Sequence, residues 1–382
     1  MSLPTPSFSI VTGDFVPTGG MDRANYALAD YLARQGVDLH LVAHRVDPAL
    51  ADRSNVTVHQ VSKPLNSYLL GAPLLARRGI EIARTSSKPP NHSIVNGGNC
   101  PGTDINWVHY VHAAYQSQTR TSPIAEAKKQ LDRRLALRSE RTALQQSRIA
   151  IANSRLTQNH LIDLLHLTPS QVKTIYYGTD PDVFYPATAA EIAKLRGEYS
   201  WDLHCPIVTF IGALGDRRKG FDTLFEAWQQ LCRDPNWDAR LVTIGIGDEL
   251  ALWQERTKAA GLTDRIQFMG FRRDVPSILR AAECLVAPTR YEAYGLGVHE
   301  AFCCGLPAIT TATAGVAERY SAQLQDLLLP DANDVEDLVQ RLSKWHQHRD
   351  YYRQHAIAMS DSLRRYTWDD MARDLIDTIE HH

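Results

Sequence analysis

Short apolar runs alternate with longer amphipathic stretches along the first half of the chain. The run Phe8–Thr12 leads through a glycine-containing loop into the stretch 21–35, whose apolar positions repeat at helical spacing. A strand at 38–43 completes a strand–helix–strand unit, which predicts a right-handed parallel connection. The pattern predicts further strands at 56–61, 93–95, 106–111, 149–152 and 172–176, and helices at 123–147 and 155–165.

The same alternation restarts after a segment rich in turn-forming residues, Gly178–Pro186. We therefore predict an N-terminal domain of residues 1–186 and a C-terminal domain of residues 187–366, followed by a last helix within 367–382. In the second domain the pattern predicts strands at 206–211, 240–244, 266–269, 284–287 and 308–311, and helices at 220–232, 249–260 and 275–281. Strands and helices in alternation indicate an α/β protein with doubly wound sheets, whose ligands bind outside the carboxyl ends of the strands.

Composition narrows the class of protein. The 382 residues carry 44% hydrophobic and 22% charged residues, which is typical of a globular protein of about two domains. A net charge of −2 argues against binding nucleic acid by bulk electrostatics. The six cysteines show no metal-ligand spacing, and several lie in or beside apolar runs, which predicts reduced, packed thiols. Met1–Pro4 does not look like a signal peptide and no apolar run is long enough to span a membrane, so we expect a cytoplasmic protein.

The most informative segment follows the predicted strand 284–287. A loop holds Glu292, a helix is predicted to begin near Gly295 or Leu296, and Glu300 lies about one turn inside it. The two glutamates have seven residues between them, and the free N–H groups of the helix start lie between the two carboxylates. A helix start favours anions. An anion flanked by hydroxyl groups, as in a sugar nucleotide, would find donors in the middle and an acceptor at each end.

This arrangement resembles the glutamate–seven–glutamate motif of glycosyltransferase family 4 (GT4). Its flanks strengthen the resemblance: Tyr294-Gly-Leu after the first glutamate, Glu300-Ala-Phe-x-x-Gly-x-Pro at the second, and Gly315-Val-Ala-Glu318 further on. The resemblance implies a GT-B fold, with two facing Rossmann-like domains and an interdomain cleft. It also implies a retaining transferase that takes its sugar from a UDP- or GDP-sugar. The donor is then expected on the C-terminal domain and the acceptor on the N-terminal one.

A cluster of cations follows the strand 206–211. Arg217-Arg-Lys-Gly220 lies where a glycine-rich loop meets the next helix, and fixed cations there would stabilise the charge that develops on a departing diphosphate. The resemblance assigns this role to Lys219. The chain departs from the family pattern at Ala213, where an arginine is common, so Arg217 or Arg218 is expected to supply the guanidinium. A solvated loop is the alternative.

Two segments of the N-terminal domain extend the resemblance. Gly19-Gly20 stands in the loop after the first strand, where main-chain N–H groups would meet the sugar or phosphate. His109 and His112 follow Trp107, and on a strand they would point to opposite faces. The family has a histidine near the reacting sugar at a comparable place. We assign that role to His109, with a structural role for both histidines left open.

The triplet Asp180-Pro-Asp182 has the spacing of an Asp-x-Asp metal clamp. It also matches the connector after the last N-domain strand of the resembled family, and its proline favours a turn. Since Lys219 and a helix start are expected to hold the diphosphate, we predict no obligatory metal or other cofactor.

The resemblance therefore implies a metal-independent glycosyltransferase that acts on an acceptor hydroxyl. The residues assigned to catalysis are His109, Lys219 and Glu292, and those assigned to donor binding are Gly19, Gly20, Arg218, Lys219, Glu292, Tyr294, Gly295, Leu296 and Glu300. A sugar-nucleotide epimerase and a non-catalytic partner subunit on the same fold are alternatives, and Ala213 is the feature that favours the second of these.

The acceptor, which could be a glycan, a lipid or a small molecule, is not identified by the sequence. The basic pairs Arg77-Arg78, Lys128-Lys129 and Arg133-Arg134 leave peripheral contact with the inner face of a membrane open, and ordinary solvated helix faces are the alternative reading.

Overall fold

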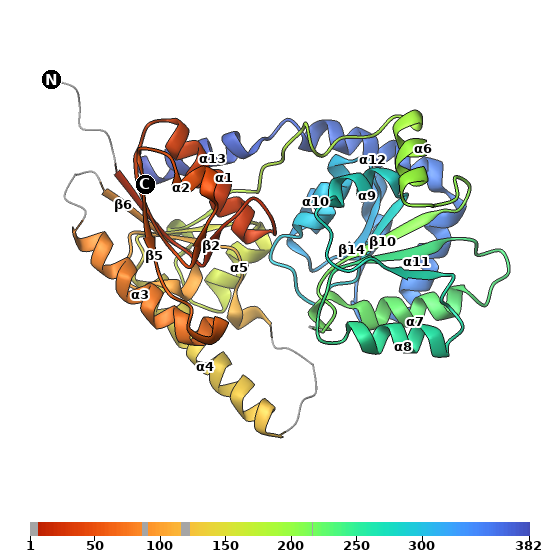
Figure 1. The fold of residues 1–382 in the computed structure, drawn as a ribbon, viewed down its shortest axis with the longest axis horizontal. Helices are drawn as coiled ribbons and strands as arrows, with labels where there is room; N and C mark the ends of the chain where they lie inside the picture. The colour runs from red at the N-terminus through yellow and green to blue at the C-terminus, as the bar shows by residue number, and fades with distance from the viewer. Residues whose placement is uncertain (1–6, 86–90, 116–122, 216) are drawn as a thin grey trace. The chain divides into compact units, whose positions relative to one another are not determined.

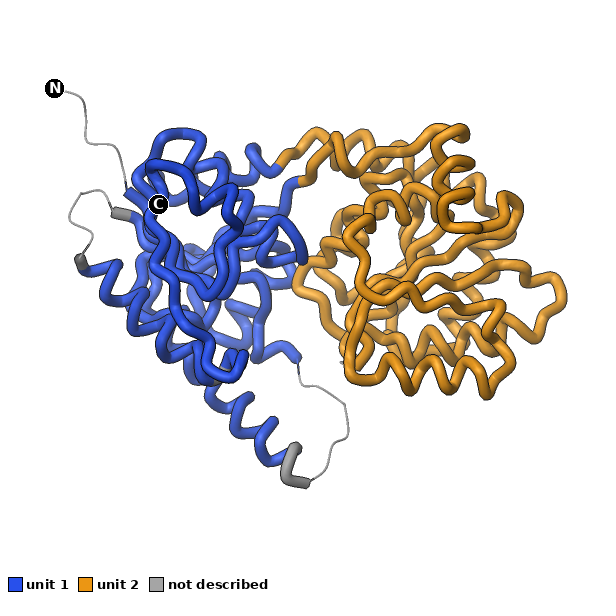
Figure 2. The backbone as a smooth tube through the Cα atoms, in the orientation of Figure 1, with its two compact units in different colours: residues 1–116, 120–178, 368–382 blue, residues 117–119, 179–367 orange. Residues whose placement is uncertain are grey.

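The computed structural model describes residues 7–85, 91–115, 123–215 and 217–382. They form two compact units (Figure 2). Unit 1 contains the described residues up to Gly178 together with Trp368–His382, and unit 2 is Thr179–Thr367. Each unit has a parallel sheet covered by helices (Figure 1).

The sheet of unit 1 has seven parallel strands in the order β5-β3-β1-β6-β7-β8-β9. Successive strands move outward from β1 in one direction and from β6 in the other, so the winding reverses between these two neighbours. The strands are β1 (Ser7–Val11), β3 (Asp38–Ala43), β5 (Val56–Gln60), β6 (Asn91–Val95), β7 (Ile105–Val108), β8 (Ile149–Ala152) and β9 (Val172–Thr174), and β2 (Asp14–Phe15) pairs separately with β4 (Arg45–Val46).

Five helices of more than one or two turns belong to unit 1 in the described residues: α1 (Met21–Arg34), α3 (Tyr68–Thr85), α4 (Pro123–Gln146), α5 (Arg155–Asp163) and α13 (Trp368–Glu380). The last helix, α13, packs against α1. It buries Met371, Leu375 and Ile379, three positions of the apolar stripe seen in the sequence. Arg34 of α1 donates two hydrogen bonds to the Asp369 carboxylate, at 2.6 and 3.1 Å, and so fixes this pairing.

Unit 2 has a six-stranded parallel sheet in the order β12-β11-β10-β13-β14-β15, with the winding reversed between β10 and β13. The strands are β10 (Ile207–Ile211), β11 (Arg240–Ile244), β12 (Ile266–Phe268), β13 (Cys284–Ala287), β14 (Ala308–Thr311) and β15 (Leu328–Leu329). The helices around it are α6 (Ala189–Glu198), α7 (Phe221–Leu231), α8 (Leu250–Ala259), α9 (Val275–Ala281), α10 (Leu296–Cys303), α11 (Val335–Gln347) and α12 (Arg349–Leu363).

The α/β class, the parallel sheets and most of the predicted strands and helices are confirmed, with end points shifted by a few residues. One strand prediction is wrong at its end: β7 stops at Val108 instead of reaching 111. The chain turns away there because the buried Glu140 carboxylate of α4 accepts the N–H groups of His112 and Ala113, at 2.8 and 3.2 Å. Those N–H groups therefore take no part in the sheet.

Helices α3 (Tyr68–Thr85), α6, α11 and α12 were not predicted from the sequence pattern. Two of these helices have readable start signals: Thr188 and Glu191 form a capping box at α6, and the Asp334 side chain caps α11. The six cysteines carry free thiols, of which Cys100, Cys284, Cys303 and Cys304 are buried. No helix among the described residues is long and apolar enough to cross a bilayer.

Candidate active site

The candidate site of unit 2 lies where the winding of the sheet reverses. The loops that leave β10 and β13 begin at the carboxyl ends of these neighbouring strands. In a doubly wound sheet this is the point where ligands bind. The first loop carries Arg217–Lys219, a short 3-10 turn, and the second carries Glu292.

The two loops are locked together by main-chain contacts. Gly220 has a φ of +71°, and a Cβ atom at this position would lie 1.9 Å from the Pro288 carbonyl oxygen. No other residue type fits there without moving one of the loops. The Arg218 carbonyl accepts hydrogen bonds from the Arg290 N–H at 2.8 Å and from the Thr289 hydroxyl at 3.0 Å.

The side chain of Arg290 also holds the two loops together. Its guanidinium donates to the Arg217 carbonyl and makes a bidentate contact with the Asp222 carboxylate of α7, at 2.8 and 3.0 Å. It also donates to Asn333 at 2.7 Å. One largely buried arginine therefore ties the β10 loop, the start of α7 and the β13 loop into a single arrangement.

Lys219, Arg218 and Glu292 form the charged centre of the site. The Lys219 ammonium donates to the Glu292 carboxylate, and an Arg218 Nη1 atom lies 3.5 Å from the same oxygen, Oε2. Burial raises the pKa of Glu292, but the two cations lower it by more, so the net pKa lies below its usual value. The carboxylate is therefore ionised near neutral pH and holds both cations at the carboxyl ends of the strands.

The two arginines of the β10 loop, Arg217 and Arg218, have different partners. Arg218 also donates to the Tyr291 carbonyl at 3.0 Å, which keeps its guanidinium beside Glu292. Arg217 instead lies 3.7 Å from the Glu249 carboxylate next to α8. Of the two arginines considered as substitutes at Ala213, Arg218 is the one that shares the carboxylate with Lys219.

The start of α10 is shaped by a second segment, residues 314–316. The Gly315 and Val316 N–H groups donate to the carbonyls of Glu292 and Tyr294, at 3.0 and 2.6 Å. Gly295 has a φ of +110° as the N-cap of α10, and a Cβ atom there would lie 2.8 Å from Val316. The glycine is required both by its left-handed backbone and by this close approach.

The remaining predicted residues of this segment differ in accessibility. Leu296 is the first residue of α10, where the helix was predicted to begin, and its side chain is partly buried. The Tyr294 side chain is buried, and its hydroxyl lies 2.8 Å from His299 Nδ1, so it supports the helix from within. Glu300 points from the second turn of α10 and is 8% exposed. Its role in donor binding stays a prediction.

In unit 1, Gly19 and Gly20 immediately precede α1, in the segment that connects β1 to this helix. Strand β1 is one of the two strands between which the winding reverses. Gly19 has a φ of +82°, and no heavy atom lies within 4 Å of where a Gly20 Cβ would be. Asp22 stands in the first turn of α1. Its pKa is raised to about 6, mainly by burial and also by Asp14.

His109 lies directly after β7 and is buried. Its Nδ1 atom shares a hydrogen bond with the Tyr177 hydroxyl, which also accepts from Asn153 at 3.1 Å. Its Nε2 atom has no hydrogen-bond partner among the described residues. Burial lowers the pKa of His109 to about 3, so the imidazole is neutral at physiological pH. His112 is exposed and opens a short 3-10 turn, so the two histidines do not occupy opposite faces of one strand.

Asp180 and Asp182 form a turn, with the Asp182 N–H donating to the Asp180 carboxylate at 3.1 Å. In the described part of the chain, no group of three or more His, Cys, Asp or Glu side chains is arranged to hold a metal ion.

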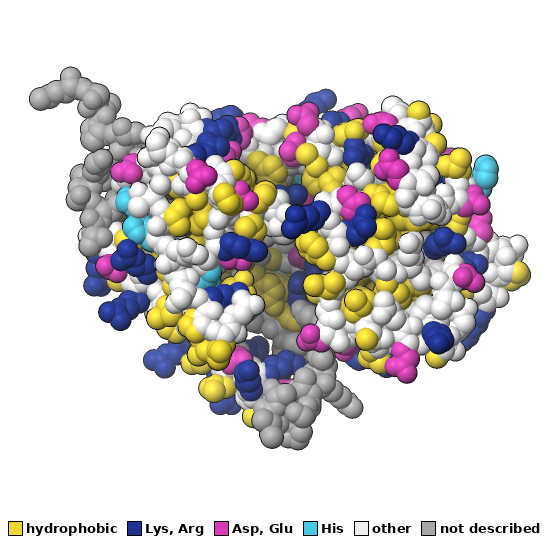
Figure 3. Space-filling model, in the orientation of Figure 1, with side chains coloured by type: hydrophobic (Ala, Val, Ile, Leu, Met, Phe, Trp, Pro, Cys, Tyr) yellow, Lys and Arg dark blue, Asp and Glu magenta, His cyan; other side chains and the backbone are white. Residues whose placement is uncertain are grey.

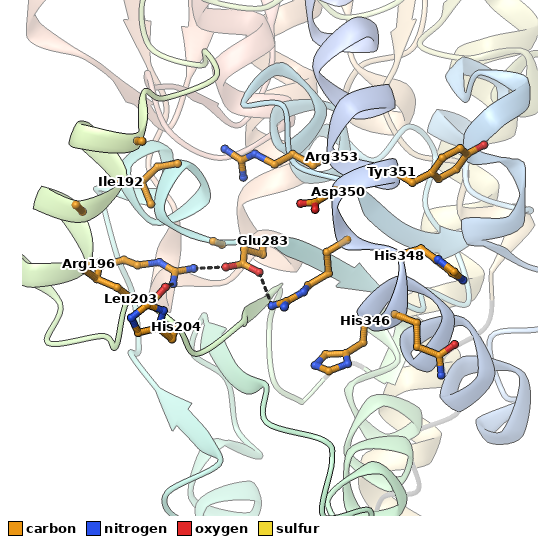
Figure 4. Close-up of a pocket in the computed structure, with 15 residues that line it drawn as sticks. Ile192, Arg196, Leu203, His204, Glu283, His346, His348, Asp350, Tyr351 and Arg353 are labelled. Carbon is orange, nitrogen blue, oxygen red and sulfur yellow. Dashed lines mark hydrogen bonds and ion pairs between the residues drawn. The ribbon is translucent and has the colours of Figure 1, made fainter.

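A pocket of about 820 Å³ opens at the opposite, amino-terminal edge of the unit 2 sheet, between α6 and the start of α12 (Figure 4). Glu283 lies at its centre and pairs with Arg196 at 2.7 Å and with Arg349 at 3.3 Å. Arg196 also donates to the carbonyl of Ala281 at the end of α9 and to three loop carbonyls, of Asp202, Leu203 and Cys205, so this network binds the fold together. The pocket is lined by none of the predicted site residues.

Comparison with known proteins identifies the family. The family model "Glycosyltransferase Family 4" matches residues 18–183, and the model "Glycosyl transferases group 1" matches residues 205–348. The chain belongs to the group 1, family 4 glycosyltransferases.

The similarity extends to individual proteins. The chain is 29% identical over 245 residues to mannosylfructose-phosphate synthase of Agrobacterium fabrum, covering 61% of this chain and 52% of that protein. Among solved structures, sucrose-phosphate synthase from Thermosynechococcus elongatus superposes with a TM-score of 0.78 at 19% identity, over 98% of this chain and of that one. Anabaena HepE in complex with UDP-glucose gives 0.72 at 17% identity, over 98% of this chain and all of the other. The fold is GT-B, as the resemblance implied.

The residues that position the charged centre of this glycosyltransferase were not predicted from the sequence. Arg290, Asp222 and Thr289 touch the loops without belonging to the glutamate motif. The only signal for Arg290 is its place two residues before Glu292, directly after a buried strand. Its partners Arg217 and Asp222 lie about 70 positions earlier in the chain and Asn333 lies 43 positions later, so these contacts become visible only in the fold.

Proposed function

We propose that this glycosyltransferase is a retaining enzyme that moves a sugar from a UDP- or GDP-sugar to an acceptor hydroxyl. The observation that carries the proposal is the Lys219–Glu292 pair, with Arg218 at its side, at the reversal of the unit 2 sheet. Two cations and a helix start in one place match the charge of a nucleoside diphosphate. Anabaena HepE, whose structure was solved with UDP-glucose, supports this class of donor.

In the proposed mechanism the bond between the sugar and the diphosphate breaks, and its electron pair goes to the phosphate oxygen. Lys219 and Arg218 would stabilise that developing charge. Glu292 would keep the lysine in place through their hydrogen bond. The acceptor oxygen would attack the anomeric carbon from the face that the phosphate leaves, and the departing phosphate would take the acceptor's proton. No covalent nucleophile is required on this route.

His109 is proposed to act as a neutral polar group in unit 1. Its Nδ1 atom is occupied by Tyr177, which leaves Nε2 as the atom that would meet a sugar hydroxyl. Gly19 and Gly20 would contribute main-chain N–H groups, Gly295 and Leu296 would present the start of α10 to the donor, and Glu300 would accept from the ribose. Donor contacts would belong mainly to unit 2 and acceptor contacts to unit 1.

A donor screen tests the proposal. Purified protein is heated with UDP-, GDP- and ADP-sugars, and the right donor at about 100 times its Kd should stabilise the fold by about 2.7 kcal/mol. Labelled donor is then incubated with candidate acceptors. Phosphorylated sugars come first, because mannosylfructose-phosphate synthase and sucrose-phosphate synthase are among the similar proteins.

The products of this reaction separate the candidate functions. Transfer with the anomeric configuration retained, in excess EDTA, would support the proposal including its independence of metal. An isomerised sugar nucleotide would indicate an epimerase, and donor binding without turnover would indicate a non-catalytic subunit. Complete loss of activity in EDTA, restored by Mg²⁺ in wild type and not in Asp182→Ala, would replace the cation assignment with a metal site.

A further inference from the structure

The junction between the 3-10 turn η1 (Pro64–Asn66) and α3 exposes large apolar side chains. Leu65 is 91% exposed, Tyr68 57%, Leu70 45% and Leu74 39%. We call these four residues the α3 patch. Figure 3 shows hydrophobic side chains gathered over α3, with Lys and Arg side chains around them. Single exposed leucines are common on soluble proteins, but Leu70 and Leu74 are exposed one turn apart on the same face of α3, and Leu65 is exposed in the turn before the helix.

The backbone places Leu65 in this exposed position. Leu65 and Asn66 both have left-handed backbones, with φ of 51° and 52°. Asparagine tolerates this conformation, whereas leucine adopts it rarely because its Cβ crowds the following carbonyl. The strained turn directs the leucine away from the body of unit 1, where it buries almost none of its surface. Residues with such backbone strain cluster at ligand clamps, switch regions and active sites.

The cations nearest to the patch are Lys63 and Arg77. Two further arginines, Arg53 and Arg78, are paired with Asp30 and Glu81, at 2.5 and 2.8 Å. Lys63 lies 3.3 Å from the centre of the Tyr68 ring, and Arg77 is exposed one helical turn beyond Leu74. Apolar side chains bordered by cations are the combination that binds the interface of a membrane with anionic lipids.

A second helix of unit 1 repeats the combination. On α4, Leu131 is 56% and Leu135 46% exposed, and Lys128, Arg134 and Arg138 are exposed beside them. Both helices contact the short turn η2 (Gly97–Asn99). The approach of α4 to this turn is close, since a Cβ on Gly98 would lie 2.9 Å from the Glu140 backbone nitrogen.

We propose that the α3 patch docks this protein peripherally on an anionic lipid bilayer. Leu65, Leu70 and Leu74 enter the headgroup region, and the surrounding lysine and arginines contact lipid phosphates. A bilayer fits better than a second copy of the chain, because pairing the same surface with itself would bring like charges together. The proposal is independent of the sugar-transfer reaction, so it stands or falls without a donor or an acceptor.

Vesicle flotation tests the proposal with the full chain. The vesicles are of phosphatidylcholine alone or of equal parts phosphatidylcholine and phosphatidylglycerol. Wild type should float with the anionic vesicles, and added salt should weaken this binding. The triple variant Leu65→Ser, Leu70→Ser, Leu74→Ser should bind at least about tenfold more weakly. Lys63→Gln with Arg77→Gln should weaken binding about 30-fold, about fivefold per cation.

The matched control replaces three exposed leucines elsewhere: Leu164, Leu203 and Leu252, which are 38%, 56% and 37% exposed. Their triple serine variant should bind like wild type. If the patch triple variant fails to fold by circular dichroism, Leu65→Ser alone replaces it, because this side chain makes the least contact with the protein. Absence of binding to anionic vesicles would overturn the proposal, as would equal loss in the control triple. So would a wild-type dimer that the patch variant converts to monomer, since the patch would then bind a second copy.

Discussion

The two units hold their candidate site residues in opposite electrostatic ways. In unit 2, Lys219 and Arg218 share the ionised Glu292 carboxylate, so the centre consists of full charges held in fixed positions. In unit 1, His109 is buried beside Tyr177 and Asn153, and burial keeps its imidazole neutral. The charged arrangement can bind an anion. The neutral one can only form hydrogen bonds that involve no charged group.

The difference follows from what surrounds each residue. Glu292 is partly buried, and two neighbouring cations outweigh the cost of removing its charge from water. Within the described residues His109 has no carboxylate partner, so a proton on its ring would be an uncompensated buried charge. The proposed division of labour is therefore a charged centre for the diphosphate and a neutral one for sugar hydroxyls. Four predictions test this contrast.

The largest expected effect is the loss of a cation from unit 2. Lys219→Ala should reduce kcat about hundredfold, ~2.7 kcal/mol of transition-state stabilisation, because the charge that develops on the phosphate loses its nearest ammonium. Initial rates of sugar transfer measure it. The matched control is Lys344→Ala, which removes a lysine paired with Asp326 in the same unit. Equal rates for Lys219→Ala and wild type, with normal circular dichroism, would remove Lys219 from the site.

The neutral state of His109 in unit 1 should make the free energy of unfolding fall at acid pH. The pKa of His109 is lowered to about 3 in the folded protein and returns to about 6.5 on unfolding, so only the unfolded state takes up a proton as pH falls below 6.5. Between pH 7.5 and 5, this histidine alone should cost about 2 kcal/mol of the free energy of unfolding. Urea denaturation at both pH values measures the loss in wild type and in His109→Gln. If the variant loses as much stability as wild type, the histidine is not held neutral.

Glu300→Ala tests whether the buried carboxylate of α10 binds the nucleotide. A ribose contact is much the same in the ground state and the transition state, so KM for the donor should rise about tenfold while kcat changes little. Steady-state kinetics with varied donor separates the two parameters. A collapsed kcat at unchanged KM would move Glu300 from the nucleotide to the reacting centre.

Arg290→Lys should have the smallest effect of the four. The variant keeps the charge but loses the bidentate contact with Asp222, so the β10 and β13 loops should be less well aligned. We expect kcat/KM to fall about fivefold, ~1 kcal/mol. Arg341→Lys is the control, because Arg341 has a carboxylate and a carbonyl partner in the same unit, away from the site. An equal effect in both variants would mean that Arg290 acts only through stability.

Much of the fold was readable from the sequence because both sheets are parallel and buried. Their strands are short apolar runs, and β3, β8, β11, β13 and β14 were predicted to the residue. Helix α3 was not predicted, since it carries exposed leucines, two internal glycines and a proline, and so has no single apolar stripe. The end of β7 was also missed, because it depends on the Glu140 carboxylate, which lies 28 positions after His112 and 27 after Ala113.

The sequence by itself determined which residue types stand at the strand ends: the cations before Gly220, the two glutamates around Gly295 and the histidine after Trp107. These features are local, because a stretch of about twenty residues is enough to determine a strand, the loop after it and the start of the next helix. Only the tertiary structure decided which charged side chains are in contact with one another. Lys219 and Glu292 are 73 positions apart, and the reversal of winding between β10 and β13 brings them into contact. The choice of Arg218 over Arg217, the burial of His109 and the lock made by Arg290 depend in the same way on segments that are distant in the chain. Distances and burial, and therefore pKa values, are set by packing between such segments.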